Sequence, residues 1–219
     1  MITAPEALQR LRDGHQRFVS NNRGRHATPD RAQRAALANG QHPFAIILGC
    51  SDSRVPPEIV FDQGLGELFV VRVAGNIAAP AQIGSVEFAA RHFDTRLVVV
   101  LGHSRCGAVL ATLKHLETST DERSPHLQSI VECVRPSVEA LLKSDVARDR
   151  AALVQDAVRA NIRASVTCLR RSAILADLAE VDGLVVVGAE YSLDTGSVEF
   201  LDDYVTGSQA FEVEATSHL

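Results

Sequence analysis

Four short apolar segments, separated by longer stretches with helical periodicity, restrict the fold of this chain more than any other feature. They cover residues 44–49, 68–74, 97–102 and 184–189, and three of them are nearly continuous runs rich in β-branched residues. Strands that are apolar along nearly their whole length are typical of a parallel sheet with helices on both faces. The sequence therefore predicts an α/β fold with a mostly parallel central sheet of four strands flanked by helices.

Helices are expected between and around these strands. The apolar period places them at residues 81–93, 106–117, about 124–143 and about 148–179, with two more in the first 35 or so residues. Near the C-terminus, EYSLDTGSVEF predicts a turn at Asp-Thr-Gly and then a short edge strand around Val198–Leu201. No linker, repeat or low-complexity stretch divides the chain, so we expect a single domain over residues 1–219, with an N-terminal helical arm over residues 1–38.

Composition argues against several classes of function. The net charge of −5 provides no basic field for nucleic acid or an anionic membrane, and the longest apolar runs, such as LVVVL, are far too short to cross a bilayer. The first residues resemble an amphipathic helix rather than a signal peptide, and four cysteines are too few for a disulfide scaffold. We therefore expect a cytoplasmic protein that binds neither nucleic acid nor membrane.

Reactive side chains follow two of the expected strands directly. The first strand runs into Cys50, Asp52 and Arg54, and the third runs into His103 and Cys106. Because the carboxyl ends of parallel strands lie at one edge of a sheet, both motifs are expected at the same place. Two sulfurs, one imidazole nitrogen and one carboxylate oxygen form a plausible tetrahedral set for Zn²⁺. The alternative, two small buried cysteines and a histidine that caps a helix, leaves the carboxylate and the arginine unexplained.

The sequence CSDSRVPPEIVFDQGLGELFVVRVAGN, followed by GHSRCGAV, closely resembles the β-class carbonic anhydrases, and the resemblance extends over most of the chain. It implies a lyase, carbonate dehydratase, that hydrates CO₂ reversibly to bicarbonate and a proton. It also implies one Zn²⁺ per chain with the ligands Cys50, Asp52, His103 and Cys106. The expected assembly is a homodimer or a dimer of dimers, in which the N-terminal arm packs on a partner subunit.

A zinc ion with all four of these ligands would be closed to water, and closed sites are structural. Arg54 offers a resolution, because Asp52 can leave the metal for a bidentate pair with the guanidinium group. Water then takes the vacated position, and the zinc hydroxide that forms near neutral pH attacks CO₂. The resemblance gives the Asp52–Arg54 pair the same role of gating and orienting the bound water.

Five further residues are expected around the substrate because of the resemblance: Gln41, Phe69, Ala74, Phe88 and Gly107. Gln41 and Phe69 stand where plant-like members use a Gln and a Phe in the CO₂ pocket. Ala74 and Phe88 stand where those members often carry Val and Tyr, so a tyrosine hydroxyl is missing here. The amide of Gly107 is expected to face bound bicarbonate. Gln41 as a polar loop residue and Phe69 as a core residue remain the alternatives.

Three other functions remain open from the sequence. Hydrolysis of COS or CS₂ uses the same fold and zinc motif, and only a direct assay separates it from CO₂ hydration. A zinc-stabilised scaffold without catalysis is disfavoured by Arg54, since a permanently closed site needs no partner for Asp52. A nucleotide-binding protein is disfavoured because no glycine-rich loop follows the first strand. Cys133 and Cys168 lie in expected helices and are interpreted as buried structural thiols.

Overall fold

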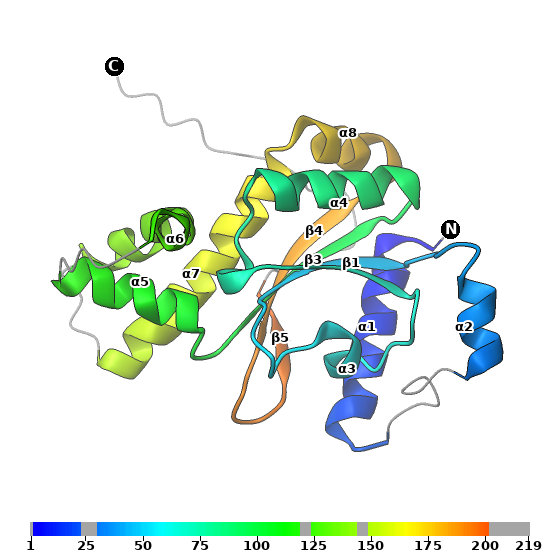
Figure 1. Cartoon of the computed structure of the whole chain (residues 1–219), viewed down its shortest axis with the longest axis horizontal. Helices are drawn as coiled ribbons and strands as arrows, with labels where there is room; N and C mark the ends of the chain where they lie inside the picture. The colour runs from blue at the N-terminus through cyan, green and yellow to red at the C-terminus, as the bar shows by residue number, and fades with distance from the viewer. Residues whose placement is uncertain (1, 23–29, 119–123, 144–148, 202–219) are drawn as a thin grey trace.

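A five-stranded sheet organises the computed structural model, which describes residues 2–22, 30–118, 124–143 and 149–201 (Figure 1). Its strand order is β2-β1-β3-β4-β5; the first four strands are parallel, and β5 pairs antiparallel to β4. The bounds are β1 Ala45–Gly49, β2 Leu68–Arg72, β3 Leu97–His103, β4 Val185–Tyr191 and β5 Val198–Phe200. The predictions of an α/β fold, four parallel strands and a short edge strand are confirmed.

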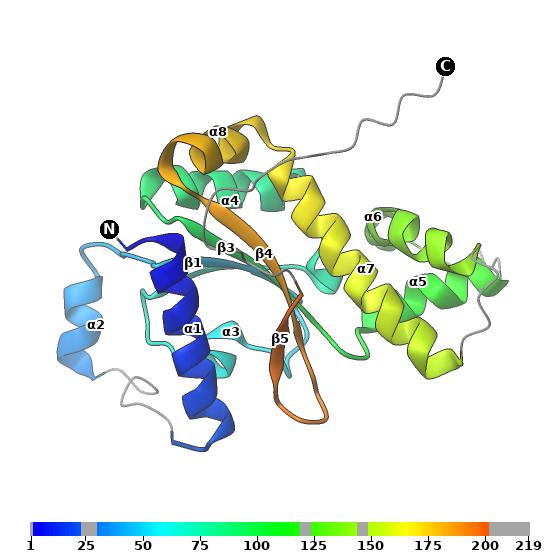
Figure 2. The ribbon, with the colours of Figure 1, turned by 180° about the vertical axis from the view of Figure 1, so that it is seen from behind.

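Alternation of side chains along the strands builds an apolar layer on each face of the sheet. On one face, residues such as Leu48 and Val100 pack against α4 (Pro80–His92), α5 (Gly107–Thr118), α6 (Pro125–Leu142), α7 (Arg150–Arg170) and α8 (Ala173–Asp182). On the other face, residues such as Ile47 and Val99 pack against α1 (Ala4–Val19) and α3 (Pro57–Val60). Figure 2 shows α1 from this second side. Because both faces are covered, β1 and β3 are buried along their whole length, which explains their unbroken apolar sequence.

The first part of the expected N-terminal arm lies on the sheet of its own chain. Thr3 caps α1 through a capping box with Glu6, and the buried side of the helix faces the sheet. His15 fixes the far end, because its Nδ1 lies 3.0 Å from the carbonyl oxygen of Val60 and its Nε2 accepts from the amide of Val198 at 2.9 Å. The second helix, α2 (Arg31–Leu37), is largely exposed, and residues 23–29 of the arm lie outside the described ranges. The packing of the N-terminal arm on a partner subunit stays a prediction.

The structure corrects two predictions about the C-terminal half. The single helix expected over about 148–179 is two helices, α7 and α8, because Ser172 caps α8 by accepting a hydrogen bond from the amide of Leu175. The apolar period continues across this break, so periodicity alone does not reveal it. The prediction that the thiols of Cys133 and Cys168 are buried is also wrong, since Cys133 is exposed and Cys168 is only half-buried. Within the described ranges, none of the helices combines the length and apolar character that a membrane crossing requires.

We expect Gly14→Ala to lower the stability of the fold. A Cβ atom at Gly14, on the buried side of α1, would lie 1.9 Å from the carbonyl oxygen of Phe61. Backbone cannot move away as a flexible side chain can, so the cost is expected to reach the upper part of the about 1–3 kcal/mol typical of overpacking. Urea unfolding measures it. Gly84→Ala is the control, because its Cβ meets nothing within 4 Å and alanine should stabilise helix α4 by about 0.5–1 kcal/mol. Equal unfolding midpoints would contradict this.

Candidate metal centre

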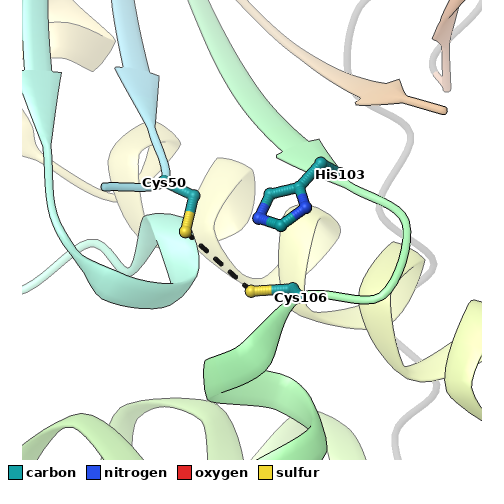
Figure 3. Close-up of side chains that lie close together, drawn as sticks. All are labelled: Cys50, His103 and Cys106. Atoms are coloured by element: carbon teal, nitrogen blue, oxygen red, sulfur yellow. Dashed lines mark hydrogen bonds between the residues drawn. The ribbon is translucent and has the colours of Figure 1, made fainter. Parts of the chain in front are cut away.

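Cys50, His103 and Cys106 meet at the carboxyl edge of the sheet. Cys50 follows β1, His103 ends β3, and Cys106 directly precedes α5, so two adjacent parallel strands bring the three side chains together (Figure 3). Their sulfur and nitrogen atoms all lie within 4.8 Å of one another, and the two sulfurs are 4.0 Å apart. All three residues are buried. Such a group of soft and borderline donors could hold a metal ion.

The turn between His103 and Cys106 is held in an unusual conformation. Arg105 has a φ of 55°, in the left-handed region that non-glycine residues rarely adopt. The end of β4 supports it: the amide of Ser104 donates to the carbonyl oxygen of Tyr191 at 2.9 Å, and the hydroxyl oxygen of Ser104 accepts from the amide of Leu193 at 2.9 Å. Arg105 itself pairs with Asp194. The two hydrogen bonds of Ser104 return Cys106 to a point beside His103 within three residues.

The imidazole of His103 carries the signature of a ligand. Its Nδ1 lies 3.0 Å from the carbonyl oxygen of Ser104, which can only accept, so Nδ1 holds the hydrogen and Nε2 keeps its lone pair. The side chain is fully buried, and Nε2 has no hydrogen-bond partner among the described residues. A buried polar atom without a partner is costly in a native fold. A metal ion between this nitrogen and the two sulfurs would satisfy it, so the residues fit a zinc ion.

The two thiols are tightly coupled. The hydrogen bond from Cys106 to Cys50 lowers the pKa of Cys50 against the opposing effect of burial, and the amide of Gly75 donates to the same sulfur at 3.4 Å. That hydrogen bond, together with burial and the charge on Cys50, raises the pKa of Cys106. The pair thus favours ionisation of one thiol, and a bound cation would favour the loss of protons further, because metal ligands must be deprotonated.

Asp52 points to Arg54 rather than into the three-residue cluster. The guanidinium group donates from Nε to Oδ1 at 2.9 Å and from Nη2 to Oδ2 at 2.7 Å, and the Arg54 amide donates to Oδ1 at 2.9 Å. These bonds hold the pKa of Asp52 well below its usual range, so the carboxylate stays ionised. Its Oδ2 is 3.8 Å from His103 Nε2, at the margin of the cluster. Asp52 is thus next to the candidate ligands and bound to a different partner.

Arg72 supports the backbone of this site, a role that the sequence did not predict. It ends β2, paired in register with Gly49, and donates from Nε to the carbonyl oxygen of Cys50 at 3.0 Å and from Nη2 to that of Asp52 at 2.6 Å. Both bonds fix the backbone that carries a candidate ligand and the candidate gate. No sequence motif marks such a role, because it depends on the pairing of two strands more than twenty residues apart.

The five expected substrate residues are spread around this centre. Gly107 is exposed at the start of α5, with open space where a Cβ would lie, and Ala74 is half-buried in the short helix η2 (Ala74–Asn76). Phe69 is packed against the core, and its ring lies 6.4 Å from that of Phe88, which is itself 53% exposed. Gln41 is exposed before β1. The contacts of Phe69 therefore agree with its alternative interpretation as a core residue. The pocket roles of all five residues stay predictions.

The mostly parallel sheet and the buried Cys-His-Cys group at its carboxyl edge place this chain among the α/β proteins with a site that could hold a metal ion. Residues 45–198, most of the chain, match the family model described as "Carbonic anhydrase". The chain belongs to the β-class carbonic anhydrase family.

Similar proteins agree with this assignment. The chain is 40% identical to "Carbonic anhydrase 2" of Mycobacterium tuberculosis over 197 residues, which cover 90% of this chain and 92% of that protein. Among solved structures, it is similar to the β-carbonic anhydrase CafA of Aspergillus fumigatus, with a TM-score of 0.70, 25% identity and 90% of each chain covered. It is also similar to one of two tetrameric β-carbonic anhydrases of Sordaria macrospora, with a TM-score of 0.67, 26% identity, and 77% of this chain and 85% of that chain covered.

Proposed function

We propose that this protein catalyses the reversible hydration of CO₂ to bicarbonate, with one zinc ion per chain bound by Cys50, His103 and Cys106, and with Asp52 as an exchangeable fourth ligand. The observation that carries the proposal is the orphaned Nε2 of His103, which faces two coupled thiols. Family membership adds the activity, since the similar proteins are named carbonic anhydrases. Bound there, zinc would supply the Lewis acid that makes hydroxide available from water near neutral pH.

Asp52 and Arg54 have complementary roles in this proposal. The guanidinium group holds both carboxylate oxygens, so it would keep Asp52 off a bound zinc ion and leave room there for water. Because the carboxylate is ionised, it would accept a hydrogen bond from that water and orient it, but it would not store the proton released by the reaction. The proton therefore passes to buffer or to another group. Arg72 keeps Asp52 within reach by holding its carbonyl oxygen.

The substrate is proposed to lie on the open side of Gly107, whose backbone amide would face bicarbonate. Gln41, Phe69, Ala74 and Phe88 complete the proposed pocket, with Gln41 donating to a bicarbonate oxygen. Gln41 and Phe88 are exposed in the single chain, so a partner subunit would have to cover them. A homodimer or a dimer of dimers is proposed for this reason, and the tetrameric relatives from Sordaria macrospora support an oligomer.

A cytoplasmic location, where both thiols stay reduced, and a single domain over residues 1–219 complete the proposal.

Stopped-flow CO₂ hydration on protein of measured zinc content tests the function. We expect activity that requires about one zinc per chain, falls by roughly 100-fold or more on removal of the metal by a chelator, and returns with added zinc. Measurements from neutral to alkaline pH would show when the site opens. A fully zinc-loaded protein that does not accelerate hydration would overturn the proposal. Sulfide release from COS or CS₂ in its place would identify the alternative substrate.

A further inference from the structure

Asn161 is a buried amide that the proposed mechanism does not use. It lies on α7 and is 2% exposed, among apolar residues of the same helix face such as Val158 and Ile162. A primary amide in such surroundings is costly unless it is hydrogen-bonded. Its Nδ2 donates to the carbonyl oxygen of Gly75 at 2.8 Å. The side-chain amide therefore donates to the backbone of a residue 86 positions earlier in the chain.

Gly75 connects this amide to the candidate metal centre. While its carbonyl oxygen accepts from Asn161, its own N–H donates to the sulfur of Cys50 at 3.4 Å. The two polar groups of a single residue thus join α7 to a candidate ligand. The φ and ψ angles of Gly75 set the orientation of its carbonyl group relative to its N–H, so a contact that fixes the carbonyl group restrains the direction of the N–H.

Gly75 needs an external anchor because glycine restricts its own backbone least. Its φ of 76° is in the left-handed region, and a Cβ there would lie 3.1 Å from the Cβ of Ala108. Both the backbone conformation and the space disfavour a side chain here, and glycine lacks the steric limits on φ and ψ that a side chain would impose. The hydrogen bond from Asn161 supplies a limit from outside the turn.

Close packing fixes the distance between α7, which carries Asn161, and the sheet. The next residue, Ile162, packs into a notch at Gly102 and Gly188, where added Cβ atoms would lie 2.5 Å and 2.8 Å from its side chain. These two glycines lie on adjacent strands, β3 and β4, and Gly102 immediately precedes His103. The notch thus holds the Asn161 amide at a defined distance from the turn and from the edge of the sheet.

We propose that Asn161 is a positioning residue for the metal centre, acting through Gly75 to aim an N–H donor at the sulfur of Cys50. The inference rests on the proposed metal site and assigns a function to a residue outside the four ligands. An N–H donor stabilises charge on a thiolate and fixes the direction of the sulfur. Without the anchor, Gly75 can reorient, and the cluster binds metal less tightly.

Zinc retention against a competing chelator tests this on Asn161→Ala. We expect the affinity for zinc to fall by about 10–100-fold, the range seen when an outer-shell partner of a ligand is removed. In the cobalt-loaded protein, the sulfur-to-cobalt charge-transfer band should move to longer wavelength, because the sulfur loses a donor. Val158→Ala, another truncation of a buried residue on the same helix, is the matched control and should lower thermal stability while leaving both readings unchanged.

Asn161→Ser is the second variant, for the case that alanine does not fold. Its hydroxyl can bond within the helix but is too short to replace the amide at Gly75, so it should repeat the loss of affinity. Equal zinc retention and an unshifted band in a folded Asn161 variant would overturn the positioning role and leave the proposed function standing. Zinc binding without CO₂ hydration in the unmutated protein would overturn the function, while the affinity comparison would still decide the role of Asn161. An unmutated protein that binds no zinc would overturn both.

Discussion

Arg54→Ala is expected to leave zinc bound and to remove most of the CO₂ hydration activity. Arg54 lies outside the Cys50–His103–Cys106 cluster and donates to both carboxylate oxygens of Asp52. Without the guanidinium group, Asp52 is free to turn toward the cluster, whose nearest nitrogen is 3.8 Å away, and to close the position that water needs. The result would be a metal site with the ligand set of a structural centre.

The size of the effect follows from the loss of an oriented group. Removal of one preorganised polar group from an active site lowers kcat by roughly 10²–10³-fold, and closure of the site adds to this loss. The pKa of Asp52 would rise toward its ordinary value of about 4, which is still far below neutral pH, so protonation does not prevent the carboxylate from binding metal. Stopped-flow rates at neutral pH, with zinc measured on the same sample, provide the test.

Arg105→Ala is the matched control for this variant. Arg105 is as exposed as Arg54, with side-chain exposures of 57% and 55%, and it lies in the other ligand-bearing loop, but its partner is Asp194. Its loss should change activity far less. Arg54→Lys keeps the charge but loses the bidentate geometry, so its CO₂ hydration activity should lie between those of Arg54→Ala and Arg105→Ala. Full activity in zinc-loaded Arg54→Ala would remove the gate from the mechanism.

The sequence was sufficient for the parts of the fold that depend on local pattern. Strands β1 and β3 were predictable because burial on both faces demands unbroken apolar residues, and the turn before Val198 was predictable from Asp-Thr-Gly. The break between α7 and α8 was not, because Ser172 lies in an apolar period that continues across it. The docking of α1 on its own sheet depends on the approach of Gly14 to the Phe61 backbone, which no local pattern reports.

The same distinction applies to the candidate site. Cys50, His103 and Cys106 could be placed together from sequence because they lie at or just after the carboxyl ends of two neighbouring parallel strands. The roles of Arg72 and Asn161 could not be predicted, because each donates to a backbone group that only the folded chain brings near. Side-chain chemistry at strand ends is visible in a sequence, while hydrogen bonds to distant backbone atoms are not.

Cys106→Ala is expected to lose the metal, and with it the activity. Zinc sites of four ligands bind with about 10–16 kcal/mol, so one ligand of four contributes about 3 kcal/mol, a factor of roughly 10²–10³ in affinity. Asp52 cannot compensate, because it can fill only one position and Arg54 competes for it. Zinc measured after dialysis against a weak chelator should fall well below one per chain.

Cys133→Ala separates the loss of this ligand from the loss of a thiol in general. Cys133 is exposed on α6 and is not part of the cluster, so its removal should leave zinc content and CO₂ hydration unchanged. Cys106 is buried beside Cys50, and its truncation also removes the contact between the two sulfurs, although the Gly75 amide still donates to Cys50. The comparison therefore needs unfolding curves of both metal-free proteins, so that a folded Cys106→Ala is shown to lack zinc because of the missing sulfur. A folded Cys106→Ala that keeps about one zinc per chain would exclude Cys106 as a ligand, since four-coordinate zinc has no spare donor in this cluster.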